Sequence, residues 1–331
     1  MSLSPHRDEP GDRSGPANAS RPAESAPRER ITLRTLARMA RAFAAGEGPP
    51  FAALTAYDAT TARWLERAGV HMLLVGDSAA EVVFGFERTI DIPLDPLIAL
   101  TAAVRRGSPN TVLMADMPFL SYGADEADGV RNAGRFLVEG RADIVKLELQ
   151  ASQAPLVARL TECGIPVCAH VGSKPQHVAL TAGYTSAGRT AADAQRIVED
   201  AVELERAGAV MLLVEAVPDD VTEEIRARTS APLIGIGAGT ACHGQILVVH
   251  DLLGLTDHPP RFAEPAAALG PEIRRAGEEW VRRVAARDLG GRRYTMREGE
   301  SERFRRGAGP GRSPGNGASA VPNEPAGRGR V

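Results

Sequence analysis

Short apolar segments that alternate with helix-like segments constrain the fold of this chain more than any other feature. Eight segments of four to six residues are rich in aliphatic side chains, as expected for buried parallel strands. Helical patterns, several of them ending at Gly, lie between most of these segments. The predicted strands are Phe51–Thr55, His71–Val75, Thr111–Ala115, Asp143–Leu147, Pro166–His170, Ala209–Val214, Pro232–Ile236 and Ile246–Val249.

Eight strands that alternate with helices favour an α/β fold of the closed (β/α)₈ barrel type, the TIM barrel. The alternative is an open doubly wound sheet, although no Gly-x-Gly-x-x-Gly follows the first strand. The predicted helices are Ala59–Ala68, Pro96–Arg106, 125–138, 153–162, 191–207 and 219–228, with flanking helices at 32–45 and 271–287.

The two ends of the chain differ in composition from its middle. Residues 1–30 hold five Pro, five Ser and ten charges of balanced sign, and such a segment cannot form a core. Residues 301–331 hold seven Gly, four Pro and six Arg against two Glu, which is typical of a flexible segment. We therefore expect a disordered arm over 1–30, one barrel with flanking helices over 31–290, and a flexible Gly-, Pro- and Arg-rich tail over 291–331.

Charge, hydropathy and cysteine content argue against several classes of function. The chain has a net charge of −3, the arm is neutral and the tail 301–331 carries +4, so residues 31–300 carry −7. This balance argues against nucleic-acid binding. No apolar run approaches the roughly 18 residues of a membrane span, and we expect neither a signal peptide nor a membrane partner. Cys163, Cys168 and Cys242 lack C-x-x-C spacing, which predicts no disulfide framework, no zinc site and a cytoplasmic protein.

Titratable residues stand at or just past the C-terminal ends of six consecutive predicted strands, where barrel active sites are assembled. They are Asp58, Asp77, Asp116, Glu148, His170 and Glu215. An Asp in this place commonly caps the next helix, and we assign that role to Asp58, which leads directly into a helical pattern. Glutamate is a poor cap, Asp116 runs into Met-Pro-Phe, and Asp77 is far from the next predicted helix. The other carboxylates are therefore predicted to share the barrel mouth.

Carboxylates in one barrel mouth repel one another unless a cation or a proton lies between them. Oxygen ligands without a Cys or His cluster suit Mg²⁺ or a similar hard ion, which takes its other ligands from water and substrate. Lys146 lies two residues before Glu148, so both side chains project into the barrel. Because only two of the 39 basic residues are lysines, a lysine here indicates a need for a compact charge. A structural counter-ion is the alternative.

Three further features permit two interpretations each. His170 is either a hydrogen-bonded core residue, which we favour, or a catalyst. Lys174, in the turn before Pro175-Gln176, is either functional or a structural charge. The cluster Gly235–Gly239 is either an anion cradle or a close turn.

Several motifs together resemble those of the ketopantoate hydroxymethyltransferase family, in the expected order over residues 32–256. The motifs are Leu54-Thr55-Ala56-Tyr57-Asp58, Val75-Gly76-Asp77-Ser78, Thr101–Gly107, Ala115–Phe119, Val145–Glu148, Gly183-Tyr184, Gly188-Arg189, Gly235–Gly239 and Gly244–Asp251. The sequence departs from the family pattern at Phe84–Arg88, Leu149-Gln150, Ser173-Lys174 and His243. These departures bear on the oxo acid or the folate contact and leave the predicted metal ligands intact.

The resemblance implies a barrel of the phosphoenolpyruvate mutase and isocitrate lyase type that assembles as a homo-oligomer, usually a homodecamer. It also implies transfer of a one-carbon unit from 5,10-methylenetetrahydrofolate to 3-methyl-2-oxobutanoate, which gives 2-dehydropantoate for pantothenate synthesis. By motif, Asp77, Asp116 and Glu148 would bind Mg²⁺. Ser78 and Lys146, together with Asp77 and Asp116, would bind the oxo acid, and Glu215 would be the general base.

Two other functions remain open from the residues. A related Mg²⁺-dependent lyase or mutase of 2-oxo acids would use the same carboxylates, although no loop like Lys-Lys-Cys-Gly-His is present. A non-catalytic paralogue that binds oxo acids or serves only as an assembly subunit is the second, and every matched position is chemically competent for catalysis.

Overall fold

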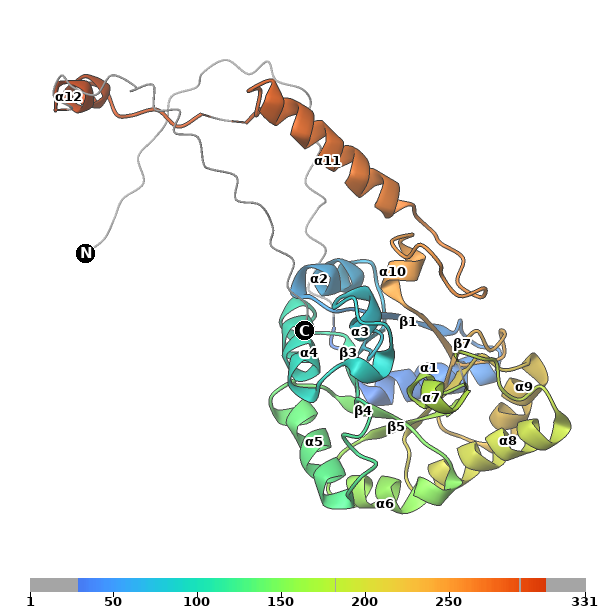
Figure 1. The fold of residues 1–331 in the computed structure, drawn as a ribbon. Coiled ribbons are helices and arrows are strands. Elements are labelled where there is room, and N and C mark those ends of the chain that lie inside the picture. The colour runs from blue at the N-terminus through green and yellow to red at the C-terminus, as the bar shows by residue number, and fades with distance from the viewer. Residues whose placement is uncertain (1–28, 182, 292, 308–331) are drawn as a thin grey trace, which may run out of the picture. The chain divides into compact units, whose positions relative to one another are not determined.

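The computed structural model describes residues 29–181, 183–291 and 293–307. Its eight parallel strands close into a barrel in the order β1 to β8, with β8 paired to β1 (Figure 1). The predicted barrel is therefore confirmed and the open sheet is wrong. The strands are β1 (Phe51–Thr55), β2 (Met72–Val75), β3 (Val112–Asp116), β4 (Ile144–Glu148), β5 (Val167–Gly172), β6 (Met211–Glu215), β7 (Leu233–Ile236) and β8 (Gly244–Leu247).

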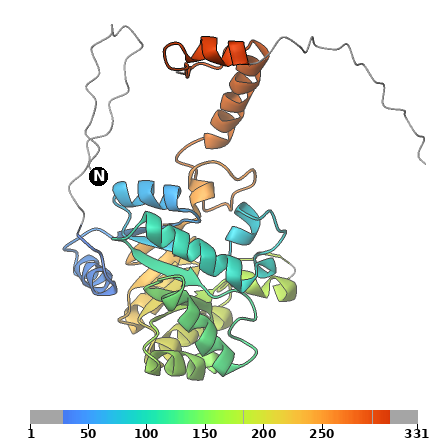
Figure 2. The same ribbon diagram turned by 90° about the vertical axis from the view of Figure 1, so that its left-hand side faces the viewer.

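Helices enclose the strands (Figures 1 and 2). The longer ones are α1 (Leu33–Ala44), α2 (Ala59–Arg67), α4 (Leu94–Gly107), α5 (Glu126–Val138), α6 (Ala154–Glu162), α8 (Ala191–Arg206) and α9 (Asp219–Arg228), close to their predicted bounds. The sequence patterns missed several shorter elements that follow strands or join helices. These are α3 (Ala79–Val82), η1 (Thr89–Asp91), η2 (Ala151–Gln153), η3 (Pro175–His177), α7 (Val178–Thr181) and α10 (Val249–Leu252).

Local side-chain chemistry fixes where several helices begin and end. The Asp58 carboxylate accepts hydrogen bonds from two backbone N–H groups in the first turn of α2, at 2.7 and 2.9 Å, so its predicted capping role is confirmed. Asp125 caps α5 and Thr190 caps α8 in the same way. At the end of α4, a Cβ on Gly107 would lie 2.1 Å from the carbonyl oxygen of Ala59. Only glycine therefore allows α4 to pack this closely against α2.

Alternate residues of each strand serve two different layers, because successive side chains point to opposite faces. One set packs between the strands and the helices, as Leu73 and Val75 do. The other set fills the barrel interior. Along β3, β4 and β6 this inward set begins with apolar side chains and ends with titratable ones. The inward residues are Val112, Met114 and Asp116 on β3, Ile144, Lys146 and Glu148 on β4, and Met211, Leu213 and Glu215 on β6.

The chain divides into two units at the boundary between Glu272 and Ile273. The barrel lies in the first unit. The helix α11 (Leu269–Ala285) spans the boundary, and the second unit also contains α12 (Glu300–Gly307). Ion pairs one turn apart, such as Arg306 with Glu302 at 3.2 Å, accompany α12. A short helix therefore interrupts the segment 291–331 that was predicted to be a flexible tail.

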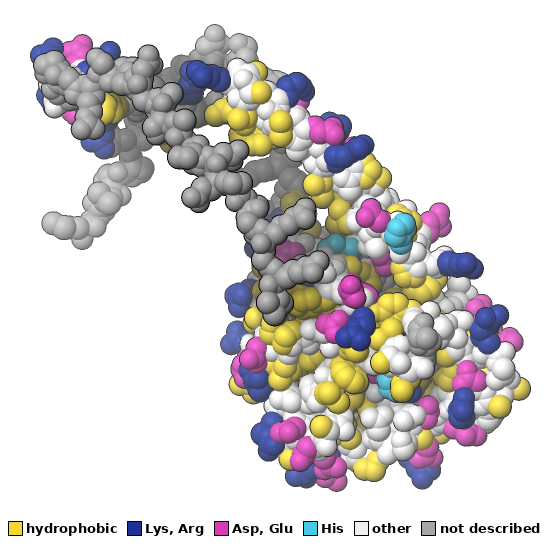
Figure 3. All heavy atoms as spheres, in the orientation of Figure 1, with side chains coloured by type: hydrophobic (Ala, Val, Ile, Leu, Met, Phe, Trp, Pro, Cys, Tyr) yellow, Lys and Arg dark blue, Asp and Glu magenta, His cyan; other side chains and the backbone are white. Residues whose placement is uncertain are grey.

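Most of the predicted arm and tail, residues 1–28 and 308–331, lies outside the described residues. None of the helices in the described part of the chain is long and apolar enough to cross a membrane. On the face drawn in Figure 3, acidic and basic side chains are interspersed around the edge of the barrel.

Candidate active site

A cavity of about 800 Å³ opens where the C-terminal ends of the strands meet. It is lined by every residue that was predicted to form the site. These residues are Asp77, Ser78, Asp116, Lys146, Glu148, His170 and Glu215. Neither Asp58 nor Lys174 lines the cavity, so no functional role for Lys174 follows from its position.

The floor of the cavity contains a buried ion pair that the strand register creates. Asp116 on β3 is paired with Lys146 on β4, and the Lys146 Nζ lies 2.5 Å from Asp116 Oδ1. The other oxygen, Asp116 Oδ2, accepts a 3.0 Å hydrogen bond from the backbone N–H of Asp77. Burial by itself would lower the pKa of Lys146, but Asp116, Asp77 and Glu148 together raise it above its usual value. Lys146 is therefore charged at neutral pH.

The neighbouring carboxylates hold protons more tightly than isolated ones. Burial raises the pKa of Asp77 to about 7, and the charge of Asp116 adds to the shift while Lys146 opposes it. Burial likewise raises the pKa of Glu148 well above its usual value, with the charge of Asp77 as the next cause. One ammonium group thus does not neutralise the whole cluster.

His170 lies between two glutamates. The register places it beside Glu148, and its Nδ1 is 3.7 Å from Glu148 Oε1 and 3.4 Å from Lys146 Nζ. Its Nε2 lies 3.6 Å from Glu215 Oε2. Burial, with the nearby charge of Lys146, lowers the pKa of His170 well below its usual value. A neutral ring that accepts from the ammonium at Nδ1 carries its hydrogen on Nε2, facing Glu215.

Glu215 ends β6 and has the properties of a base near neutral pH. Its side chain keeps 21% of its surface exposed to the cavity. Burial raises its pKa to about 7, opposed by the charge of Lys146. On the paired strand, Gly172 has a φ of +93°, and a Cβ there would lie 2.6 Å from the Glu215 carbonyl oxygen. Glycine at 172 therefore lets β5 follow β6 closely to its end.

Two uncharged residues that the strand-end pattern did not single out hold parts of the site. The hydroxyl of Tyr57 lies 2.8 Å from Ser78 Oγ, and Tyr57 itself is buried. The side chain of Gln176 donates a 2.9 Å hydrogen bond to Asp77 Oδ2. In the sequence, Tyr57 was marked only by its place in a family motif, and Gln176 only by its place in the Pro175-Gln176 turn.

The glycine cluster after β7 packs closely against other side chains. A Cβ on Gly237 would lie 2.5 Å from the ring of Phe262, and one on Gly239 would lie 2.2 Å from the Asp219 carboxylate. Both glycines also have positive φ values, +59° and +70°. A carboxylate beside Gly239 disfavours an anion cradle there, so the interpretation as a close turn is the better one.

The donor set suits a hard divalent cation better than it suits a closed metal centre. Among the described residues, no three Asp, Glu, His or Cys side chains converge as a complete ligand set. However, Glu148 Oε1 is buried and accepts no hydrogen bond within the described structure, whereas Asp116 Oδ1 is paired with the Lys146 ammonium. Mg²⁺ is usually bound by one or two carboxylates together with waters and substrate. The residues present therefore fit Mg²⁺ with an incomplete set of protein ligands.

A family model of ketopantoate hydroxymethyltransferase matches residues 30–291. The chain belongs to the ketopantoate hydroxymethyltransferase family. A relative from Halorhodospira halophila named 3-methyl-2-oxobutanoate hydroxymethyltransferase is 48% identical over 240 residues, which cover 72% of this chain and 87% of the relative. A relative of the same name from Hyperthermus butylicus is 43% identical over 281 residues, covering 84% and 96%. The predicted family is confirmed, and its members are transferases.

Solved structures share the fold of this hydroxymethyltransferase family member at low identity. A phosphoenolpyruvate phosphomutase from Streptomyces platensis subsp. rosaceus has a TM-score of 0.54 and 13% identity, covering 78% of this chain and 89% of its own. A 2,3-dimethylmalate lyase of the PEP mutase/isocitrate lyase superfamily has a TM-score of 0.51 and 18% identity, covering 84% and 98%. These likenesses establish the fold alone and confirm the predicted type of barrel.

Proposed function

We propose that this enzyme transfers a hydroxymethyl group from 5,10-methylenetetrahydrofolate to 3-methyl-2-oxobutanoate, with Mg²⁺ as its metal, to form 2-dehydropantoate. A new bond joins C3 of the oxo acid to the one-carbon unit, water supplies the hydroxyl oxygen, and tetrahydrofolate is released. The observation that carries the proposal is that one cavity is lined both by Glu215, whose pKa is near 7, and by the charged Lys146. Family membership supports the choice of substrate.

Glu215 is proposed to remove the proton from C3 of the oxo acid. A base is most effective when its pKa lies near the working pH, and the raised pKa of Glu215 meets this condition. Lys146 and Ser78 are proposed to bind the carboxylate and keto oxygens of the oxo acid as donors. The Nε2–H of His170 faces Glu215 and would favour its ionised form.

Asp77 and Asp116 would hold Mg²⁺ and also approach the oxo acid, with Glu148 completing the surroundings of the ion. A bound Mg²⁺ supplies positive charge that acidifies the C–H next to a keto group and stabilises the resulting enolate. Glu148 Oε1, which is buried and accepts no hydrogen bond within the described structure, supports this assignment. So do the raised pKa values of Asp77 and Glu148, since a cation would offset both the burial and the mutual repulsion that raise them.

The outer part of the cavity is proposed to bind the folate donor. A cavity of about 800 Å³ exceeds the needs of a five-carbon oxo acid. Phe262 lines it with an exposed aromatic ring, which suits a planar ring system. Arg261 also lines it and makes no hydrogen bond or ion pair with other described residues, so its guanidinium is free to bind a carboxylate of the donor.

We also propose a homo-oligomer, with the decamer that the resemblance implies, in the cytoplasm. Apolar side chains exposed on loops of the barrel support self-association, among them Phe84, Phe119 and Leu120, of which Leu120 is 62% exposed. The three cysteines are free thiols, which supports a reducing compartment. Mass photometry of the purified chain tests the assembly, and a monomer at micromolar concentration would contradict it.

The activity is tested by incubating the purified chain with 3-methyl-2-oxobutanoate, methylenetetrahydrofolate and Mg²⁺ and measuring 2-dehydropantoate by mass spectrometry. We expect product only when all three are present. Chelation should abolish turnover, and added Mg²⁺ should restore it. Full turnover in chelator would contradict the metal assignment, and no product with any 2-oxo acid would favour a non-catalytic paralogue.

A further inference from the structure

Gln176 connects parts of the barrel mouth that are far apart in the sequence. It lies in η3, just past β5, and only 4% of its surface is exposed. Its side-chain Nε2 donates to Asp77 Oδ2 at 2.9 Å and to the carbonyl oxygen of Met117 at 3.0 Å. Its backbone N–H donates to Glu148 Oε2 at 3.0 Å. Gln176 alone thus contacts the segment that follows β2, the segment that follows β3 and the end of β4.

The orientation of the Gln176 amide is fixed by its partners. Its Oε1 lies 2.8 Å from the hydroxyl of Tyr122, which donates to it, while its Nε2 faces two acceptors. A flipped amide would place the oxygen against a carboxylate and a carbonyl and would lose both donations. The Tyr122 hydroxyl also lies 3.2 Å from the backbone N and O of Glu148.

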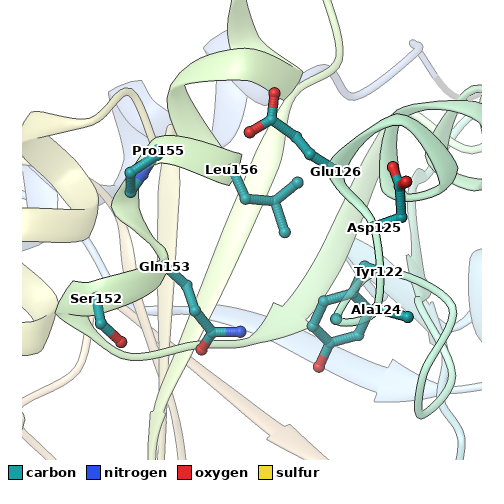
Figure 4. A pocket seen from close by; sticks show the side chains of 9 residues that line it. Tyr122, Ala124, Asp125, Glu126, Ser152, Gln153, Pro155 and Leu156 are labelled. Atoms are coloured by element: carbon teal, nitrogen blue, oxygen red, sulfur yellow. The ribbon is translucent and has the colours of Figure 1, made fainter.

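Tyr122 lies between Gln176 and a second, smaller cavity. It is 7% exposed, and its ring forms part of the wall of a smaller cavity of about 200 Å³ together with Gln153 and Leu156 (Figure 4). The network therefore runs from this outer wall through Tyr122 and Gln176 to Asp77 at the floor of the main cavity.

Gln176 binds only one oxygen of the Asp77 carboxylate and one oxygen of the Glu148 carboxylate. Asp77 has Oδ2 bound to the Gln176 amide, and Glu148 has Oε2 bound to the Gln176 backbone. Glu148 Oε1 is buried and accepts no hydrogen bond within the described structure. An oxygen held by an N–H group fixes the direction of its partner oxygen, which is how residues beyond the metal ligands orient a metal site.

We propose that Gln176 is a positioning residue for the divalent cation, and that it fixes the Asp77 and Glu148 carboxylates in the orientation that binds the ion. This inference rests on the cation site of the proposed function. Gln176 does not touch the ion or the substrate; it acts through the two carboxylates. Tyr122 supports it by holding the amide in the one orientation that donates to Asp77.

The test measures cation binding directly and needs no turnover. Binding of Mg²⁺ to the full chain without substrates is followed by calorimetry, and binding of Mn²⁺ by electron paramagnetic resonance. The variant Gln176→Met keeps the length and volume of the side chain but loses both donations. Loss of such an outer contact typically weakens metal affinity by about 10- to 100-fold, and we expect a change of that size. Tyr122→Phe should weaken affinity by a smaller factor, because the amide itself remains.

The matched control is Gln245→Met. Gln245 is half-buried and donates a single amide hydrogen bond to the Gly239 carbonyl oxygen at 2.9 Å, so its replacement removes a comparable contact away from the carboxylates. Its cation affinity should equal that of the wild type. Thermal unfolding of each variant without metal shows whether the barrel is folded.

Equal cation affinity in folded Gln176→Met and in the wild type would overturn the inference and leave the proposed function standing. If Gln176→Met does not fold, Tyr122→Phe decides: weaker affinity supports the positioning role, and unchanged affinity refutes it. A wild-type chain that binds neither ion would overturn both the cation site and this inference. Equal losses in Gln176→Met and Gln245→Met would show a general effect of buried amides and refute a specific role.

Discussion

Replacing Glu215 by Gln tests the proposed general base most directly. The amide keeps the shape of the side chain at the end of β6, with His170 3.6 Å away, but it cannot accept a proton from C3. A positioned base usually contributes about 10²- to 10⁴-fold. We therefore expect deuterium exchange at C3 of 3-methyl-2-oxobutanoate to slow by a factor in that range, while binding of the oxo acid persists.

The raised pKa of Glu215 also sets the pH dependence of the wild-type enzyme. Only the ionised carboxylate accepts a proton, and its pKa lies at about 7. The value of kcat/KM should therefore rise about tenfold per pH unit below pH 7 and level off above it. The Glu215→Gln variant should lack this rise.

The same pKa shift predicts that the stability of the folded chain falls as the pH rises, whereas kcat/KM increases. A rise from 4.5 to about 7, at about 1.4 kcal/mol per pKa unit, corresponds to at most about 3.5 kcal/mol, reduced by the partial exposure of Glu215. The folded chain keeps this proton up to about pH 7, whereas the unfolded chain releases it near pH 4.5. The stabilisation is complete below pH 4.5 and is lost as pH rises through 7. Glu215→Gln should therefore raise Tm at pH 8 and leave it nearly unchanged near pH 4.5.

Exchange is measured by proton NMR in deuterated buffer, and Tm by circular dichroism from pH 4.5 to 8. The matched control is Glu81→Gln, which changes another carboxylate of the same cavity. In the wild type the Tyr184 hydroxyl donates to Glu81 Oε1 at 2.7 Å, and the amide oxygen of glutamine would keep this acceptor. Its pH profile should follow the wild type. Exchange at the wild-type rate in Glu215→Gln would refute the assignment and make His170 the next candidate.

Three more substitutions test other parts of the site. Lys146→Arg should lower kcat by about a hundredfold, the usual effect of losing one preorganised charge contact, because a planar guanidinium would pair bidentately with the surrounding carboxylates. Lys174→Arg is the control. If the two variants have the same kcat, Lys146 is a structural counter-ion. Arg261→Gln should raise KM for methylenetetrahydrofolate about tenfold without slowing exchange at C3; a change in exchange alone would remove Arg261 from the folate site. Gly237→Ala should destabilise the chain by about 1–3 kcal/mol in urea unfolding, more than Gly46→Ala, which has a similar φ of +74° but open space around it; equal losses would show that the aromatic contact is unimportant.

The barrel and its inward face were predictable because both depend on local patterns. Each strand is short, apolar and bounded by helix signals, and the period of two places Lys146 and Glu148 on one face whatever the rest of the fold. The observed register then aligns Asp116 with Lys146 and Glu148 with His170. Short elements such as α3 and α10 were missed because four residues are too few to show a helical period.

The charged side chains that line the cavity were predictable, whereas the uncharged residues that contact them were not. Asp58 and Asp77 both follow strands, and the distance to the next helix separated a cap from a cavity residue. Gln176 and Tyr122 carry no charge and lie in irregular segments. Their roles arise from hydrogen bonds to residues 99 and 26 positions away in the chain, and no local pattern encodes such contacts.

Gly237 shows how a tertiary contact decides between two interpretations of one motif. From the sequence, a cluster of glycines suits an anion cradle and a close turn equally well. The positive φ of Gly237 would fit either of them. The deciding contact comes from Phe262, 25 positions later in the chain, whose ring occupies the space that a Cβ on Gly237 would need. Because the same ring lines the cavity, the glycine shapes the proposed folate site indirectly, by making room for the aromatic side chain.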